Sequence, residues 1–207
     1  RAFQEQGRVK VVDGALGIDY GKTPAHLSTV AALQRDYAGR VWTREVWAEQ
    51  GGNAEHIVRA ASELAGKYNI FRGKTDPLQD VLAQLLTGSP DRRIMRMRFS
   101  PARTGIGARE SRIGLVTGLI AGHRFFIDYD GPGAMELVRE IEVYHRETNQ
   151  LGDMVVQRKG EDRIAAVEYA VEALLGMADT FDWDAFQQIK PIEFKFAPGT
   201  KATSLRR

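Results

Sequence analysis

The sequence predicts an α/β domain whose central sheet contains both parallel and antiparallel strands. Strand patterns fill much of the first 50 residues, and helices then alternate with strands from residue 53 to residue 177. The chain has 207 residues, enough for one domain with a sizeable core, and it contains no internal repeat or low-complexity stretch. One domain with a mixed sheet is therefore the simplest prediction.

The first quarter of the chain is predicted to hold three strands, and a helix follows them. Residues 7–18 are typical of a buried strand entered from a polar lead, with an apolar run at 15–18. Two strand-like arms, 27–35 and 40–49, flank a turn at 36–39, which predicts a hairpin. Residues 53–67 are predicted to be helical. Their apolar side chains recur at helical spacing: Ile57, Ala60, Ala61, Leu64 and Ala65.

The middle of the chain is predicted to pass from a short strand into a helix. Residues 68–71 have a β-like composition. Asp76 followed by Pro77 is typical of the first turn of a helix, which we expect to run to Leu86. Residues 94–99 alternate apolar side chains with arginine, as an exposed strand does.

The second half of the chain is predicted to alternate helices with a strand. We expect helices at residues 111–121, 133–146 and 161–177, and a strand at 124–128. The last helix has the clearest pattern. Its apolar stripe consists of Ile164, Val167, Val171 and Leu174.

Composition excludes several classes of function. The absence of cysteine rules out disulfides, thiolate metal sites and cysteine nucleophiles. No apolar run is long enough to span a bilayer, and the first residues do not form a signal peptide, so no membrane partner is expected. The net charge of +2 is too small to indicate a partner by itself. Because the chain begins at Arg1 and not at methionine, we expect it to be a fragment of a longer protein.

Acidic residues stand at three points where they could carry chemistry. Asp19 ends the first apolar run, Asp76 follows the second short strand, and Glu161 and Asp162 open the last helix. Carboxylates gathered at one edge of a sheet are the ligands that Mg²⁺ and Mn²⁺ prefer. Two such ions, about 4 Å apart, can activate a water and stabilise the leaving oxygen of a phosphodiester.

These acidic residues also have ordinary structural explanations. Asp76 is placed as a helix cap, and Glu161 with Asp162 complements the dipole of the last helix. Asp19 differs, because an unpaired carboxylate on a buried strand is unfavourable. The spacing of the residues alone leaves the metal site and the structural explanation both open.

Two segments resemble the nuclease domain of viral large terminase subunits. Gly-Ile-Asp-Tyr-Gly at 17–21 is similar to the opening of that domain, and Arg-Lys-Gly-Glu-Asp-Arg-Ile-Ala-Ala-Val-Glu-Tyr-Ala at 158–170 is similar to its closing motif. Neither motif is specific alone, but their order and separation match over roughly residues 12–177. The resemblance implies a ribonuclease H-like fold, with a mixed sheet flanked by helices. It also implies a metal-dependent endonuclease that cuts concatemeric bacteriophage DNA during genome packaging.

The resemblance also assigns roles to individual residues. Asp19 corresponds to the first ligand of two Mg²⁺ or Mn²⁺ ions, and Asp162, with its neighbour Glu161, to the last. The middle ligand departs from the pattern, because Gly73 stands where the family usually has aspartate. Asp76 is the candidate replacement and Asp80 a poorer one, and an incomplete site is the third possibility. An incomplete site would bind metal weakly and cut slowly.

The resemblance implies partners and a setting as well. In this family the nuclease follows an ATPase motor domain, and the sequence has no G-x-x-x-x-G-K-[ST] phosphate loop, so the motor would lie outside this chain. We expect a nuclease core at about 8–178 with an extension at 179–207. The implied partners are double-stranded DNA, the motor of the same full-length chain, the portal and the small terminase subunit. The implied location is the cytoplasm of the host cell.

A run of basic residues agrees with a DNA partner. The segment 91–112 contains only two acidic residues, Asp91 and Glu110, but seven arginines: Arg92, Arg93, Arg96, Arg98, Arg103, Arg109 and Arg112. Such a stripe can neutralise phosphates without reading sequence, and the binding is then sensitive to salt. The alternative interpretation is an edge strand that carries charge to prevent aggregation.

Two other functions remain open at this stage. The actin-like fold of sugar kinases and chaperone ATPases also opens with a strand, an aspartate, a glycine and a polar turn that contacts nucleotide phosphate. Against it, the chain is short for two such lobes and has no evident second phosphate loop. The second alternative is a degenerate nuclease fold that only binds DNA, and the glycine at position 73 favours it.

Overall fold

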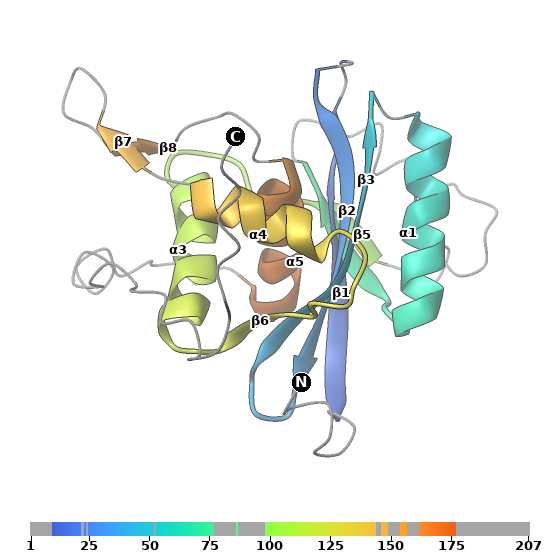
Figure 1. Cartoon of the computed structure of the whole chain (residues 1–207), viewed down its shortest axis with the longest axis horizontal. Coiled ribbons are helices and arrows are strands. Elements are labelled where there is room, and N and C mark those ends of the chain that lie inside the picture. The colour runs from blue at the N-terminus through green and yellow to red at the C-terminus, as the bar shows by residue number, and fades with distance from the viewer. Residues whose placement is uncertain are drawn as a thin grey trace, which may run out of the picture.

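The structure is a computed structural model that describes residues 10–21, 23, 25–51, 53–76, 86, 98–143, 146–148, 154–156 and 162–176. Strands and helices alternate through most of this part of the chain (Figure 1). In chain order the elements are β1 (Val11–Asp19), β2 (Leu27–Asp36), β3 (Val41–Gln50), α1 (Ala54–Tyr68), β4 (Arg72–Thr75), β5 (Arg98–Pro101), α3 (Ala108–Ala121), β6 (Phe125–Ile127), α4 (Ala134–Val143), β7 (Arg146–Thr148), β8 (Met154–Val156) and α5 (Asp162–Leu175).

Six strands form one mixed sheet in the order β5-β4-β1-β2-β3-β6. β1, β2 and β3 are antiparallel neighbours, whereas β4 runs parallel to β1, β5 parallel to β4, and β6 parallel to β3. The predicted α/β class with a mixed sheet is therefore confirmed. β7 and β8 pair separately as an antiparallel two-stranded sheet.

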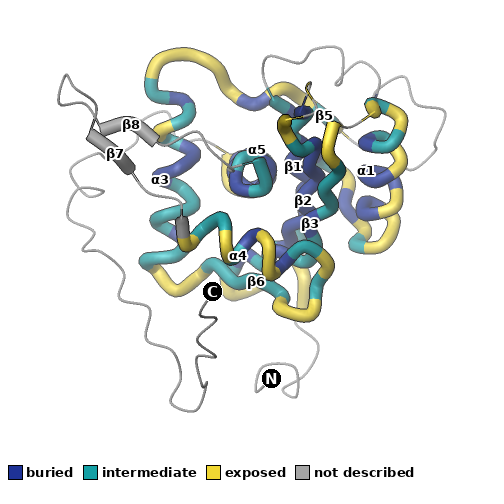
Figure 2. The backbone as a smooth tube through the Cα atoms, turned by 45° about the horizontal axis from the view of Figure 1, so that its top comes forward, coloured by how far each residue is buried: buried dark blue, intermediate teal, exposed yellow. Residues whose placement is uncertain are grey.

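Helices cover both faces of the large sheet. Figure 2 shows α1 against one face and α5 against the other, with α3 on the far side of α5 and α4 beside it. β2 is apolar along most of its length because it is covered on both sides. Its side chains alternate between the two cores: Val30 and Ala32 pack with α1, and Ala31 and Leu33 pack with α5. Burial of a leucine or valine of this kind stabilises the fold by about 2 kcal/mol.

α5 lies unusually close to β1, and a glycine permits this approach. A Cβ atom placed on Gly17 would lie 1.8 Å from the carbonyl oxygen of Ala166 and 2.5 Å from the backbone nitrogen of Ala170. The small side chains of the helix at this contact are themselves fully buried. The glycine of the opening motif therefore fixes the distance between the helix and the strand that carries Asp19.

Most of the predicted elements are confirmed, with small shifts at their ends. The predicted hairpin corresponds to β2 and β3, and the predicted strand at 124–128 to β6. The helix predicted at 111–121 begins earlier, at Ala108, directly after Gly107, whose φ of 78° ends the preceding loop. The helix predicted after Asp76 lies outside the described residues except for Leu86, which is helical and buried.

Two predicted elements are wrong in place or length. The strand predicted at 68–71 does not form, because α1 continues to Tyr68 and Asn69 caps it with a left-handed φ of 54°. The helix predicted at 133–146 is shorter. It begins after Gly133, where φ is 75°, and residues 146–148 belong to β7.

Candidate metal-dependent nuclease site

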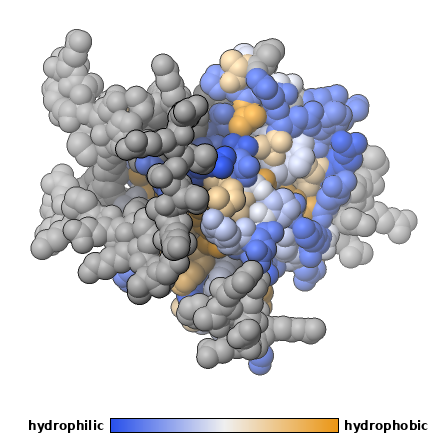
Figure 3. All heavy atoms as spheres, in the orientation of Figure 1, coloured by the Kyte–Doolittle hydropathy of each residue, from blue (hydrophilic) through white to orange (hydrophobic). Residues whose placement is uncertain are grey.

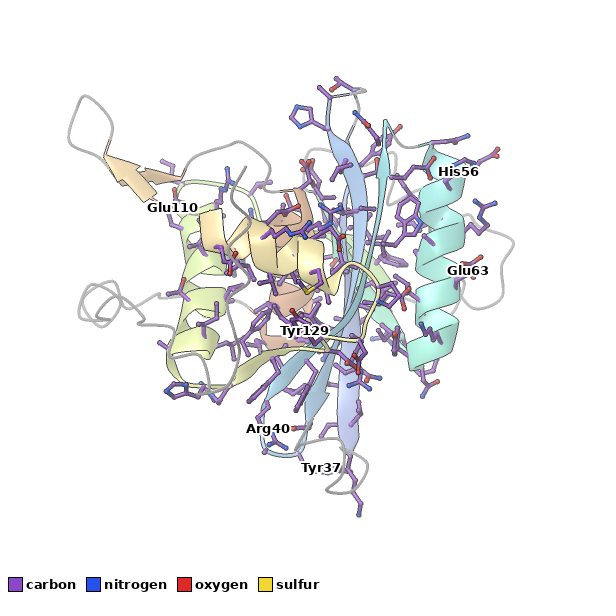
Figure 4. The ribbon with its side chains drawn as sticks, in the orientation of Figure 1. Tyr37, Arg40, His56, Glu63, Glu110 and Tyr129 are labelled. Carbon is purple, nitrogen blue, oxygen red and sulfur yellow. The ribbon has the colours of Figure 1, made fainter. Side chains whose placement is uncertain are left out.

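Two aspartates stand at the carboxyl ends of neighbouring parallel strands, at the same edge of the sheet. Asp19 is the last residue of β1, and Asp76 directly follows β4. Ile18 is in register with Thr75, and the backbone N–H of Asp76 donates to the carbonyl oxygen of Ile18 over 3.0 Å. The turn between β2 and β3, marked by Tyr37 and Arg40 in Figure 4, lies at the opposite edge. The carboxyl ends of adjacent parallel strands are a common place for catalytic groups.

The position of β4 explains why Gly73 stands where an aspartate was expected. Gly73 lies inside the strand, paired with Leu16 on one side and Phe99 on the other. A Cβ atom there would lie 2.5 Å from the Phe99 ring and 2.9 Å from the carbonyl oxygen of Leu16. An aspartate would not fit at this position, and Asp76 is the first residue beyond the strand.

Asp162 reaches the same edge from the first turn of α5. Its Oδ2 accepts a hydrogen bond from the backbone N–H of Leu27 at 3.1 Å, and its carbonyl oxygen accepts one from the Thr29 hydroxyl at 2.8 Å. Thr29 is the β2 residue paired with Asp19. The exposed side chain of His26 lies 3.7 Å from Asp162 Oδ1. The carboxylate of Asp162 therefore lies beside the start of β2, and β1 separates β2 from β4 in the sheet.

The start of α5 is fixed by a carboxylate from α4. Glu140 Oε2 accepts from the backbone N–H groups of Arg163 and Ile164 at 3.0 and 3.3 Å, and Glu140 Oε1 pairs with the Arg163 guanidinium at 2.6 Å. Burial raises the pKa of Glu140, although Arg163 acts in the opposite direction. Because a helix N-terminus is the positive end of the dipole, the Glu140 carboxylate both satisfies the first-turn N–H groups of α5 and complements its charge.

Tyr169 belongs to α5, which covers the sheet face on which both strand-end aspartates lie. Asp19 is two residues beyond Gly17, which contacts α5, and Asp76 is two residues beyond Lys74, which pairs with Glu172 of α5. Burial raises the pKa of the Tyr169 phenol, the charges of Asp19 and Asp76 raise it further, and Arg112 lowers it. The phenol remains protonated at neutral pH and adds no negative charge to the site.

A buried ion cluster lies next to Tyr169, and the sequence interpretation missed it. Glu172 is only 2 % exposed, and it pairs with Lys74 at 3.0 Å and with Arg112 at 3.4 Å. It also accepts a hydrogen bond from the backbone N–H of Arg103 at 3.0 Å. The signal was present in the sequence, since Glu172 interrupts the most apolar part of the last helix. The cluster joins α5 to β4 and to the loop after β5.

The Arg112 guanidinium belongs to this cluster and not to the surface. Its side chain is 6 % exposed, it lies 5.1 Å from the centre of the Tyr169 ring, and it donates to the carbonyl oxygen of Arg103 at 2.9 Å. Burial removes Arg112 from the predicted DNA-contacting set. Arg98 and Arg103 are exposed and Arg109 is half-buried. The remaining members of that set, Arg92, Arg93 and Arg96, lie outside the described residues.

The described residues partly fit a divalent metal site. Asp19 and Asp76 supply two carboxylates at one sheet edge, which is the donor chemistry of Mg²⁺ or Mn²⁺. Within the described part of the chain, no three acidic or histidine side chains gather closely enough to hold an ion. The carboxylate of Asp162 is instead hydrogen-bonded to β2. Glu161 and Asp80 lie outside the described residues.

Comparison with solved structures identifies the fold. The chain matches the large terminase nuclease of the thermophilic phage G20c, solved with bound magnesium, at a TM-score of 0.61 and 16% identity, over 81% of this chain and 89% of that one. The fold is that of a phage large terminase nuclease domain. The nuclease domain of Thermus phage P74-26 matches at a TM-score of 0.56 and 15% identity, over 78% of this chain and 77% of that one. The predicted ribonuclease H-like architecture is thus confirmed.

A longer large terminase, from another thermophilic bacteriophage, also matches, at a TM-score of 0.61 and 15% identity. The match covers 78% of this chain but only 40% of that one, so this chain spans less than half of the longer terminase. No protein-family model and no curated protein sequence matches the chain. Among the described residues, no helix is both long enough and apolar enough to cross a membrane.

Proposed function

We propose that the chain is a metal-dependent DNA endonuclease that cleaves phosphodiesters with little sequence specificity. The observation that carries the proposal is the pair Asp19 and Asp76, which leave adjacent parallel strands of a terminase-nuclease fold at the same level. In such a fold, two carboxylates at this edge supply the oxygen ligands that Mg²⁺ and Mn²⁺ prefer. The G20c nuclease, which has been solved with magnesium and with cobalt, supports this assignment.

Asp19 and Asp76 would hold the metal, with Asp162 and Glu161 supplying the third acidic group. When bound, two divalent ions supply an activated water nucleophile and stabilise the departing 3′ oxygen. Asp162 can take part while it keeps its hydrogen bond to Leu27, because that bond uses Oδ2 and a carboxylate has a second oxygen, Oδ1, to offer an ion.

The chain's own residues prepare the site for an anionic substrate. The neutral phenol of Tyr169 keeps further negative charge away from the two aspartates. The exposed arginines Arg98 and Arg103, with Arg109, would contact the DNA backbone and make binding sensitive to salt.

The biological setting that we propose is that of the phage terminases whose fold the chain shares. A packaging nuclease of this kind would cut concatemeric phage DNA in the host cytoplasm, as one domain of a longer chain that also contains an ATPase motor. The longer phage terminase, which is more than twice the length of the part that this chain matches and has been solved with ADP, supports this arrangement. Residues 1–207 would then form a single nuclease domain, with the portal and the small terminase subunit as further partners.

Nicking of a supercoiled plasmid by the 207-residue chain tests the proposal. We expect relaxed and linear DNA with Mn²⁺ or Mg²⁺ and none with EDTA. A folded chain that binds duplex DNA but never cuts it, with either metal, would instead establish the DNA-binding alternative. The glycine at position 73, where the family usually has aspartate, is the feature that favours that alternative. Binding of ATP analogues in the absence of DNA binding would contradict both.

A further inference from the structure

The loop at residues 102–107, between β5 and α3, exposes an isoleucine completely. Ile106 has a relative exposure of 110 %, the highest among the large apolar side chains that the structure describes. Figure 2 shows this loop as an exposed arch that passes from β5 to α3 at the same end as the start of α5. Single exposed apolar residues are common on proteins, so exposure alone does not assign a role to Ile106.

The backbone on either side of Ile106 makes this tip protrude. Gly105 and Gly107 have φ values of 112° and 78°, and a Cβ atom on either one would meet nothing within 4 Å. The tip therefore stands clear of the neighbouring described side chains. On the face shown in Figure 3, hydrophilic side chains cover most of the described surface, and apolar ones reach it in places.

The base of the loop is held firmly where it leaves β5. The backbone N–H of Ala102 donates to the carbonyl oxygen of Thr75 at 2.8 Å, and the backbone N–H of Arg103 donates to buried Glu172 at 3.0 Å. The Arg112 guanidinium donates to the carbonyl oxygen of Arg103 at 2.9 Å. A loop with this many buried anchors is preorganised, so it loses little conformational entropy when its tip enters a partner.

The anchor also places the tip near the strand-end aspartates. Thr75, which accepts from Ala102, immediately precedes Asp76. Ile106 is four residues beyond Ala102, so it lies within about 14 Å of that hydrogen bond. The exposed side chain of Arg103 and the half-buried side chain of Arg109 flank the tip, and the exposed Glu110 is the acidic residue next to them. Arginines that can bind phosphate lie around an apolar tip. This combination suits a DNA partner better than it suits a partner protein with an apolar surface.

We propose that Ile106 is a wedge that inserts between stacked base pairs of duplex DNA bound at the strand-end aspartates. The inference rests on the proposed nuclease function, and it adds a residue that deforms the substrate. Isoleucine is among the side chains that proteins insert at base steps, where partial unstacking kinks the duplex. Arg103 and Arg109 hold the backbone on either side of the step, and the kink brings one strand toward Asp76.

Fluorescence of 2-aminopurine placed along a short duplex tests the wedge directly, because the signal rises when the base is unstacked. In EDTA, to prevent cutting, we expect the wild-type chain to raise the signal at one or two adjacent steps, and Ile106→Ser to lose most of that rise. We expect Ile106→Ser to bind about five- to tenfold more weakly and Ile106→Leu to behave as the wild type does. Tyr37→Ser, an exposed apolar side chain at the opposite edge, is the matched control.

The outcomes separate the wedge from the nuclease. If wild type binds and cuts DNA but neither unstacks a base nor depends on Ile106, the wedge is rejected and the nuclease stands. A wild type that neither binds nor cuts DNA overturns both proposals. Because Ile106 is fully exposed, its variants are expected to fold as the wild type does, and circular dichroism checks this.

Discussion

The backbone N–H of Asp76 donates to the carbonyl oxygen of Ile18, the residue before Asp19, over 3.0 Å. This bond continues the parallel ladder between β1 and β4 for one more step. It therefore holds the two aspartates in register at the point where both strands end. The proposed metal site depends on this register, because a shift of one residue would turn one carboxylate to the other face of the sheet.

Replacement of Asp76 by asparagine is expected to weaken metal binding while the fold is retained. The change keeps the size of the side chain but removes one of the negative charges that attract a divalent ion. We expect the dissociation constant for Mn²⁺, measured by calorimetry or electron paramagnetic resonance, to rise about tenfold or more. Asp128→Asn is the matched control, since Asp128 also follows a strand, β6, but pairs with Arg44. Equal effects of the two changes would remove Asp76 from the site.

Gly17→Ala is expected to destabilise the domain, because the added methyl would overlap the carbonyl oxygen of Ala166. Relief of that overlap must move α5 away from β1. We expect a loss of about 1–3 kcal/mol in the free energy of unfolding, measured in urea. Gly118→Ala is the control. Its methyl would meet nothing within 4 Å, and alanine in a helix is favoured by about 1 kcal/mol. A neutral Gly17→Ala variant would show that the close approach of helix and strand is dispensable.

Glu172→Gln is expected to destabilise the domain by about 3–5 kcal/mol, because it leaves the buried charge of Arg112 without its anionic partner. The variant also weakens the anchor at the backbone N–H of Arg103. Urea unfolding measures the loss, and Glu63→Gln, an exposed glutamate on α1 shown in Figure 4, is the matched control. If the two variants have equal stability, the buried cluster does not hold the fold together.

The raised pKa of Tyr169 predicts how stability depends on pH in metal-free protein. Its folded-state pKa lies above the ordinary value of 10.0, so the unfolded chain loses the phenolic proton first as the pH rises. The stability contributed by the neutral phenol is thus fully present below about pH 10 and is lost as the pH rises through the folded-state pKa.

Tyr169→Phe tests this prediction. Phenylalanine cannot ionise, so thermal melts of Tyr169→Phe should lose less stability between about pH 9 and pH 11 than those of the wild type. Tyr37→Phe, at an exposed position, is the control and should follow the wild type. Asp19→Asn removes one of the charges that raise the pKa of Tyr169, so that pKa should fall. A wild-type profile in Tyr169→Phe would contradict the raised pKa of the buried phenol.

Much of the fold could be predicted from the sequence, because its long elements have strong patterns. β1, β2 and β3 are apolar or alternate, and α1 and α5 carry clear helical stripes. β4 could not be predicted in this way. Its sequence, Arg-Gly-Lys-Thr, has no apolar pattern, and it becomes a strand only because β1 and β5 pair with it on both sides. Tertiary pairing overrides local propensity at such a strand.

The candidate site was predictable in part for the same reason. Asp19 could be predicted as a candidate ligand because it ends an obvious strand. The position of Asp76 beside it depends on β4, which the structure places at Arg72–Thr75. The sequence interpretation missed Glu172 and assigned Arg112 to the DNA-contacting surface. A buried ion cluster formed by α5, α3 and β4 has no local sequence pattern that could reveal it. Three-dimensional packing alone brings these residues together.

The most direct test of the account is plasmid cleavage by three matched proteins: the wild-type chain, Asp19→Asn and Glu63→Gln. We predict Mn²⁺-dependent nicking by the wild type and by Glu63→Gln, and a loss of at least about 100-fold in Asp19→Asn, which keeps a wild-type circular dichroism spectrum and melting temperature. Full activity in a folded Asp19→Asn variant would contradict the account, because the edge formed by Asp19 and Asp76 would then not be where DNA is cut.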